Sequence, residues 1–236
     1  MKSFLIALSL VTLLLGSSFV SFQSESNSKL YPMIKTYLKN LQKDFGSIPE
    51  ERKGELKKMA AFIETKLTSD KSASLIFICT HNSRRSHTAQ FWALAAAKFY
   101  GIEGIKAYSG GIEITAFNAN AIKALSDAGF KINKMDESAN PKYEVRYAED
   151  APPVEAFSKK YKDAPNPTSN FAAVMTCSHA DQTCPFVSGA AARIVTPYED
   201  PKEADGTPQQ DAVYRERCKQ IATEIMYVFS LVKEKK

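Results

Sequence analysis

The feature that most constrains the fold is a short apolar run followed by a polar loop and a long helix-like stretch. Residues 75–78 are apolar at every position, which is typical of a strand buried on both faces of a parallel sheet. The polar residues 79–86 follow, and residues 87–100 then carry large apolar side chains at helical spacing. A strand, a loop and a helix in this order predict an α/β fold.

The alternation of strands and helices continues towards the end of the chain. The sequence predicts further strands at residues 105–109, 171–176 and 193–196, and further helices at residues 118–128 and 207–232. We expect Thr207 to cap the last helix, with Gln210 completing a capping box. The domain 74–236 is therefore predicted to be a three-layer α/β/α fold with a mainly parallel sheet of about four strands.

Two segments stand outside this alternation. Residues 140–170 contain five prolines and are interpreted as an inserted excursion, with a short helical segment at residues 154–161. Residues 30–70 carry apolar side chains at helical spacing, which predicts an N-terminal extension of two helices packed on the main domain. Ser47 and Glu50 are expected to form a capping box where the second of these helices begins.

The first residues have the layout of a secretory signal peptide. Lys2 precedes an apolar run at residues 4–15, and small residues follow at 16–18. Residues 1–22 are therefore predicted to be a signal peptide that directs the chain to export or to a periplasm. The alternative is a retained membrane anchor, although the run is marginal against the roughly 20 apolar residues that a membrane-spanning helix needs.

The composition is that of an ordinary globular protein, and its charge suits an anionic ligand. The chain has 236 residues, of which 44% are hydrophobic and 24% are charged, and its formal net charge is +5. Basic pairs such as Lys159 and Lys160 stand among acidic residues and are interpreted as solvated surface. The sequence has no basic stripe with interleaved aromatic residues, so it does not favour nucleic-acid binding.

Cys79 is the candidate nucleophile. It lies at the carboxyl end of the predicted buried strand and just before a helix, where main-chain N–H groups and the helix dipole favour negative charge. The same position favours the thiolate form of a cysteine. Arg85 can hold two oxygens of an oxyanion in a bidentate fork, and Ser86 can donate a hydrogen bond to the thiolate. The structural alternative is a buried cysteine that ends a strand beside a surface arginine.

The loop and its surroundings resemble the low-molecular-weight protein tyrosine phosphatases and, more closely, the thioredoxin-coupled arsenate reductases that share their fold. The family's loop is typically Cys-Thr-Gly-Asn-Ser-Cys-Arg-Ser, and the positions that match it are Cys79, Thr80, Asn82, Ser83, Arg85 and Ser86. His81 stands where the family has Gly, and Arg84 stands where it has a second Cys. The resemblance covers about residues 75–232 and implies that residues 80–86 bind an oxyanion.

A second segment is similar to the redox segment of those reductases. Residues 175–185 contain Cys177 and Cys184, and in the reductases two cysteines follow the third sheet strand. The resemblance implies that Cys79 attacks arsenate, that Cys177 then attacks Cys79 and expels arsenite, and that Cys184 takes over the disulfide. It also implies a thioredoxin-like reductant as partner and no bound cofactor.

Asp200 resembles the family's general acid, which is an Asp before a Pro on a loop over the anion site. Tyrosine phosphatases of the family usually carry an aromatic residue after that Pro, and Lys202 stands there instead. Tyr198 is the candidate for an aromatic wall on the other side of the substrate. The resemblance therefore favours arsenate over an aryl phosphomonoester as the substrate.

Several alternatives stay open for the cysteines and for the function. Cys177, His179 and Cys184 are three candidate zinc ligands without an obvious fourth, so no metal site is predicted. A static disulfide between Cys177 and Cys184 would suit an exported protein. The alternative functions are phosphomonoester hydrolysis and a non-catalytic module that binds an oxyanion or a partner.

Predicted export conflicts with predicted coupling to thioredoxin, because thioredoxin acts in a reducing compartment. A periplasmic thioredoxin-like reductant would remove the conflict. So would a membrane anchor that leaves the domain in the cytoplasm. A mis-chosen start codon would also remove it, and the protein would then be cytoplasmic.

Overall fold

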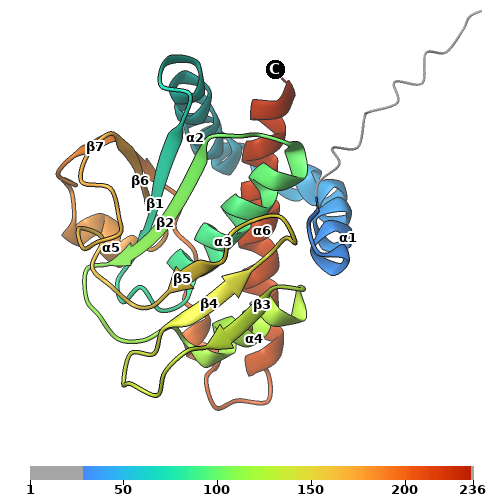
Figure 1. The fold of residues 1–236 in the computed structure, drawn as a ribbon, viewed down its shortest axis with the longest axis vertical. Coiled ribbons are helices and arrows are strands. Elements are labelled where there is room, and N and C mark those ends of the chain that lie inside the picture. The colour runs from blue at the N-terminus through green and yellow to red at the C-terminus, as the bar shows by residue number, and fades with distance from the viewer. Residues whose placement is uncertain (1–28, 235–236) are drawn as a thin grey trace, which may run out of the picture.

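The computed structural model describes residues 29–234 (Figure 1). The predicted signal peptide or anchor at residues 1–22 lies outside the described residues. Within residues 29–234, every helix is too short or too polar to cross a membrane.

The main sheet has four strands, and every neighbouring pair in it is parallel. Its order is β2-β1-β6-β7. The strands are β1 (Ala73–Cys79), β2 (Ile105–Gly111), β6 (Phe171–Met175) and β7 (Ala190–Val195). The predicted parallel sheet is confirmed, and β1 occupies one of its two central positions. Cys79 is the last residue of β1 and pairs with Gly111, which ends β2.

Both faces of β1 are buried, which explains its continuous apolar run. Leu75 and Phe77 point into one hydrophobic core, whereas Ile76 and Ile78 point into a second core on the other face. Helices α3 (Arg85–Tyr100) and α2 (Glu50–Ser69) pack against the first face, and α6 (Gln210–Glu234) packs on α3. The short helix α5 (Ser178–Thr183) covers the second face. These layers confirm the predicted three-layer α/β/α arrangement.

The N-terminal extension shares the core of the main domain. It consists of α1 (Pro32–Leu41), the 3-10 helix η1 (Gln42–Ser47) and α2 (Glu50–Ser69), and its helices lie along α6 in Figure 1. Leu38 and Met59 are fully buried in the same cluster as Phe91 of α3. Tyr37 of α1 stacks on Trp92 of α3, with ring centroids 5.1 Å apart. The extension and the sheet therefore belong to one hydrophobic core.

The predicted capping boxes have different outcomes. At α2 the prediction is wrong, because Pro49 is the N-cap and the Ser47 hydroxyl instead donates to the Asp44 carbonyl, at 2.7 Å. The fixed φ of proline places an extended residue directly before the helix and leaves Ser47 in the preceding 3-10 turn. At α6 the Thr207 hydroxyl does accept a main-chain hydrogen bond, from the Gln209 N–H. The helix begins only at Gln210, however, so the reciprocal box between Thr207 and Gln210 does not form.

The predicted helical segment at residues 154–161 is wrong. Residues Val154–Ala156 form strand β5, which pairs antiparallel with β4 (Tyr143–Arg146), and β4 pairs with β3 (Lys131–Lys134). Prolines at positions 152 and 153 favour extended backbone here, and pairing with β4 decides the conformation. This small sheet lies beside α4 (Ala119–Asp127) and apart from β7 (Figure 1).

We predict that Leu38→Ala destabilises the whole protein, because it opens a cavity in the shared core. The free energy of unfolding should fall by about 2–5 kcal/mol, measured by urea denaturation followed by tryptophan fluorescence. Met33→Ala on the same helix is the control, since Met33 is 59% exposed and should change stability little. A separate, early transition of the extension in Leu38→Ala would contradict a single core.

Candidate functional site

The loop after β1 is held in place by its carbonyl oxygens. Four of them, those of residues 80, 81, 83 and 84, accept hydrogen bonds from other parts of the protein or from α3. The donors are the N–H groups of Ile112 and Glu113 to Thr80, the hydroxyl of Ser158 to His81, the N–H of Asn118 to Ser83 and the N–H of Thr88 to Arg84, at 2.8 to 3.0 Å.

The direction of these carbonyls fixes the direction of the neighbouring N–H groups. In a trans peptide the N–H of one residue points opposite to the carbonyl of the residue before it. The N–H groups of residues 81, 82, 84 and 85, which follow the anchored carbonyls, are therefore turned away from the groups that hold those carbonyls. Within residues 29–234 no group accepts a hydrogen bond from the N–H groups of residues 81–84. The loop thus presents a row of free donors, as a tetrahedral oxyanion requires.

Asn82 makes the tight loop possible. Its φ of 45° lies in the left-handed region, which Asn tolerates better than most residues. Its side chain donates to the Ser86 hydroxyl at 2.9 Å and accepts from the Lys159 N–H at 3.0 Å. His81 keeps a negative φ, so the replacement of the family's Gly by His does not disturb the backbone.

Ser86 is oriented towards the candidate nucleophile. Its hydroxyl oxygen lies 3.1 Å from the Cys79 sulfur and already accepts from the Asn82 side chain. The hydroxyl proton is therefore free to donate to the Cys79 sulfur. Cys79 is only 3% exposed and lies beside the N-terminus of α3, where the helix dipole also favours negative charge.

Two glycines at the end of β2 let other segments approach the loop. A Cβ on Gly111 would lie 2.7 Å from the Asn82 nitrogen, and one on Gly110 would lie 2.3 Å from the Cα of Tyr161. Gly111 also pairs with the excursion, because its N–H donates to the Lys159 carbonyl at 2.8 Å. The excursion is thus tied both to β2 and to the loop.

The structure brings Arg85 and Asp200 together. The Arg85 guanidinium donates to the Asp200 carboxylate at 2.5 Å and to the Tyr198 carbonyl at 2.9 Å, while its Nε is buried without a partner. Asp200 is the N-cap of η2 (Pro201–Ala204) and is about a quarter exposed. A carboxylate on a loop beside Arg85 is the arrangement that the sequence predicts.

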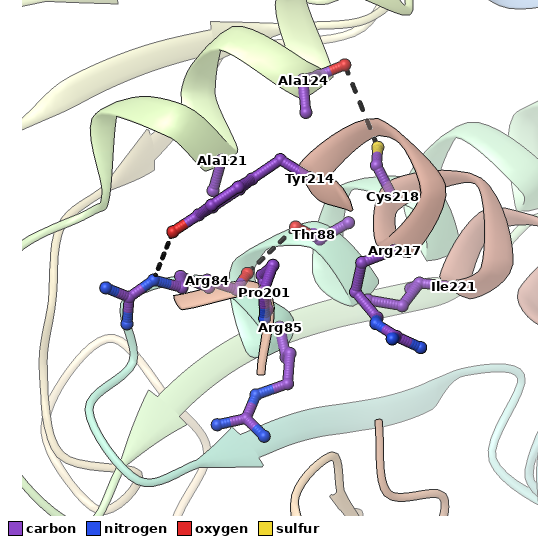
Figure 2. Close-up of a pocket in the computed structure, with 10 residues that line it drawn as sticks. All are labelled: Arg84, Arg85, Thr88, Ala121, Ala124, Pro201, Tyr214, Arg217, Cys218 and Ile221. Atoms are coloured by element: carbon purple, nitrogen blue, oxygen red, sulfur yellow. Dashed lines mark hydrogen bonds between the residues drawn. The ribbon is translucent and has the colours of Figure 1, made fainter. Parts of the chain in front are cut away.

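Arg84 points in a different direction from Arg85 (Figure 2). Its Nε donates to the Tyr214 hydroxyl at 2.9 Å, and its guanidinium lies 3.5 Å from Asp205 and 3.9 Å from Asp200. A cavity of about 10 Å³ beside these side chains has room for about one water molecule. The Arg84 side chain therefore ties the acid loop to α6, while only its main chain belongs to the row of free donors.

Tyr198 does not provide the aromatic wall suggested by the sequence. It is 5% exposed, and the Arg52 guanidinium lies over its ring at 4.8 Å. Burial and the nearby Glu224 keep the pKa of the Tyr198 hydroxyl well above its ordinary value, although Arg52 opposes this. The ring is a packing element beneath the acid loop.

The two downstream cysteines flank α5, and the first lies beside the loop. The Cys177 sulfur is buried, accepts from the Ala180 N–H at 3.3 Å and lies 3.4 Å from the Thr80 hydroxyl. Cys184 is partly exposed at the C-terminal end of α5, and all four cysteines are free thiols. Within the described residues, no three Cys, His, Asp or Glu side chains gather as metal ligands, so Cys177, His179 and Cys184 do not form the zinc site considered above.

Lys159 is buried, so the interpretation of Lys159 as solvated surface is wrong, and no pattern in the sequence indicates this burial. Its side chain is 4% exposed, and burial lowers the pKa of its ammonium to about 8, against weaker opposing effects of Glu155 and Asp163. His87 is also fully buried, and burial and the charge of Lys159 hold its pKa well below its ordinary value. Lys159 lies next to the loop because its main-chain N–H donates to Asn82, and His87 lies next to it in the first turn of α3.

Part of the domain matches a known protein family. Residues 74–148 match the family model described as low molecular weight phosphotyrosine protein phosphatase, and this stretch contains β1, the loop, α3 and β2. This part of the domain is therefore similar to that family. The family is one of enzymes, and the matched residues include Cys79 and Arg85.

Proteins similar to the domain include arsenate reductases. The arsenate reductase of Halalkalibacterium halodurans is 28% identical over 142 residues, which are 60% of this chain and 84% of that protein. The arsenate reductase of Bacillus subtilis strain 168 is 26% identical over 145 residues, which are 61% and 86% of the two chains.

Similar solved structures include a low molecular weight protein tyrosine phosphatase from T. tengcongensis. It is 18% identical, with a TM-score of 0.43, and the match covers 70% of this chain and all of that one. A thioredoxin-dependent arsenate reductase from Corynebacterium glutamicum is 16% identical, with a TM-score of 0.40 and coverage of 79% and 72%.

We predict that Asn82→Ala is less stable than Asn82→Gly by about 1–2 kcal/mol, because only Gly adopts a left-handed φ without strain. Both variants lose the bond to Ser86, so both should bind inorganic phosphate more weakly, measured by calorimetry. His81→Gly is the matched control at the neighbouring position with negative φ, and it should not increase stability. Equal stability of the two Asn82 variants would contradict the assignment.

We predict that stability attributable to Lys159 rises between about pH 8 and pH 10. The folded pKa is about 8 and the unfolded pKa is about 10.4, so in this window the unfolded state binds more protons and stability increases with pH. Relative to Lys159→Met, the wild-type free energy of unfolding should gain about 3 kcal/mol from pH 7 to pH 10.5. Parallel urea-denaturation profiles of the two proteins would contradict the lowered pKa.

Proposed function

We propose that this protein is an arsenate reductase that uses Cys79 on a bound oxyanion and Cys177 and Cys184 as a thiol relay. The observation that supports this most is the buried Cys177 thiol, 3.4 Å from the hydroxyl of Thr80, the residue after the nucleophile. Hydrolysis of a phosphomonoester would need neither downstream thiol. The similarity to bacterial arsenate reductases agrees with the proposal.

In the first step the Cys79 thiolate attacks the arsenic atom of arsenate. A sulfur–arsenic bond forms and an arsenic–oxygen bond breaks, and Asp200 supplies the proton with which that oxygen leaves as water. The free N–H groups of residues 81–84 and the Arg85 guanidinium hold the remaining oxygens.

In the second step the Cys177 thiolate attacks the Cys79 sulfur. A disulfide forms, the sulfur–arsenic bond breaks, and its electron pair stays on arsenic, which is reduced from As(V) to As(III) and leaves as arsenite. The Cys184 thiolate then attacks the Cys177 sulfur, which releases the Cys79 thiolate and leaves a disulfide between Cys177 and Cys184. A thioredoxin-like dithiol reduces that disulfide and closes the cycle.

The last exchange requires α5 to open. Cys177 and Cys184 are seven positions apart at the two ends of a helix, so a rise of 1.5 Å per residue separates their Cα atoms by roughly 10 Å. A disulfide needs Cα atoms within about 7 Å. Arg193 holds α5 closed in the reduced state through the Asp181 carboxylate and the Cys184 carbonyl.

The proposal retains the predicted export and assigns the reductant to the same compartment. Residues 1–22 carry the signal-peptide pattern. An exported reductase of this kind would draw electrons from an exported thioredoxin-like protein, and its Cys184 would receive them at the surface, where it is partly exposed.

We predict that Cys177→Ser and Cys184→Ser each abolish arsenate-dependent turnover with thioredoxin, thioredoxin reductase and NADPH. Cys79→Ser should abolish it as well, because it removes the nucleophile. Cys218→Ser is the matched control, since Cys218 is a buried thiol of α6 that accepts from the Trp92 indole N–H and has no place in the relay, so its loss should leave turnover unchanged. Turnover is measured as consumption of NADPH, on soluble protein lacking residues 1–22.

The same preparation is assayed with an aryl phosphate and no reductant. Hydrolysis that survives in Cys177→Ser and Cys184→Ser, together with absence of arsenate-dependent NADPH consumption, would replace the reductase by a phosphatase. This second candidate is supported by Asp200 beside Arg85, an arrangement sufficient to form and release a phosphocysteine.

A further inference from the structure

We propose that Arg52, on the N-terminal extension, is a positioning residue for the acid loop of the site. Helix α2 carries Arg52, and the acid loop runs from Pro197 through Asp200. The proposal rests on the proposed function only in so far as Asp200 and Arg85 act on the bound oxyanion. It gives the extension a role in the site that the phosphatase fold itself does not require.

Arg52 reaches from α2 to both the acid loop and α6. Its guanidinium makes an ion pair with Glu224 at 2.8 Å and donates to the Pro197 carbonyl at 3.1 Å. The two side chains are 16% and 5% exposed, so the pair is largely removed from water. A buried charge pair that also binds a main-chain carbonyl has a restricted geometry.

Two arginines hold two consecutive carbonyls of the acid loop. Arg52 takes the carbonyl of Pro197, and Arg85 takes the carbonyl of Tyr198, at 2.9 Å. The Arg52 guanidinium also lies over the Tyr198 ring, 4.8 Å from its centroid. The extension therefore acts on the same stretch of main chain that the oxyanion-binding arginine touches.

Asp200 follows Tyr198 by two residues, so the position of its carboxylate depends on the main chain that the two arginines hold. Upstream, the Tyr198 N–H donates to the Thr176 carbonyl at 3.1 Å, which ties the loop to the end of β6. Without Arg52 the peptide group between Pro197 and Tyr198 keeps only that N–H tie, so it can turn and displace the residues that follow it up to Asp200. A shift of about 1 Å in a catalytic group can lower turnover about a hundredfold.

The decisive variant is the double substitution Arg52→Met with Glu224→Gln. Removal of Arg52 alone would leave the Glu224 carboxylate buried without a partner and could unfold the protein. The double variant keeps similar volumes and removes both charges. Its matched control is Lys58→Met with Glu55→Gln, which removes a solvent-exposed ion pair from the same helix.

Two measurements follow the acid loop in these variants. Hydrogen exchange by mass spectrometry should show amides of residues 197–205 exchanging at least several-fold faster in the Arg52 variant than in the control. Turnover number should fall about 10- to 100-fold with a smaller change in KM, and Arg52→Lys, with Glu224 intact, should recover part of it.

A background lacking the acid separates positioning from general damage. In Asp200→Asn the Arg52 double substitution should lower the remaining turnover less than about twofold, because the group being positioned is already gone. The proposal would be overturned if the Arg52 double variant showed the same hydrogen exchange and turnover as the control. It would also be overturned if the double substitution lowered turnover as much in the Asp200→Asn background as in the wild type. If the wild type turns over neither arsenate nor an aryl phosphate, the proposed function fails and the exchange data alone decide the role of Arg52.

Discussion

The site depends on the direction of the peptide groups between Cys79 and Arg85. Their carbonyls are anchored to the end of β2, to α4's N-cap and to the excursion, and the free N–H groups follow from that anchoring. Like-directed N–H dipoles repel one another when no anion lies between them, so the loop depends on this anchoring to keep them aligned. The surrounding segments therefore supply the order that an oxyanion would otherwise have to impose on binding.

The parts that could be predicted from sequence are those that a local pattern determines. The apolar run 75–78 predicts a strand buried on both faces, and the cysteine after it lies at the carboxyl edge of the sheet. Asp200 lies near the same edge, because it contacts Arg85. The failures arise where distant residues decide. Residues 154–156 became a strand because β4 offers an edge, and Lys159 became buried because its main chain is needed by Gly111 and Asn82. No pattern near Lys159 records those partners.

The extension illustrates the same limit. Its helices were predictable from apolar spacing, but spacing cannot tell a separate helical hairpin from a layer of the main core. The contacts decide this: Tyr37 stacks on Trp92, and Arg52 reaches the acid loop and Glu224. A segment that looks dispensable in sequence therefore shares both the core and the surroundings of the site.

The pair formed by Arg85 and Asp200 would make binding of the proposed oxyanion an exchange of ions. Without a ligand, the Arg85 guanidinium is already paired with the Asp200 carboxylate at 2.5 Å. An incoming dianion therefore has to displace that carboxylate and does not meet an unpaired guanidinium. The displaced Asp200 then loses its cation and gains an anionic neighbour, so it has to turn away from the Arg85 guanidinium. The same anion that occupies the guanidinium would thus release the carboxylate from it.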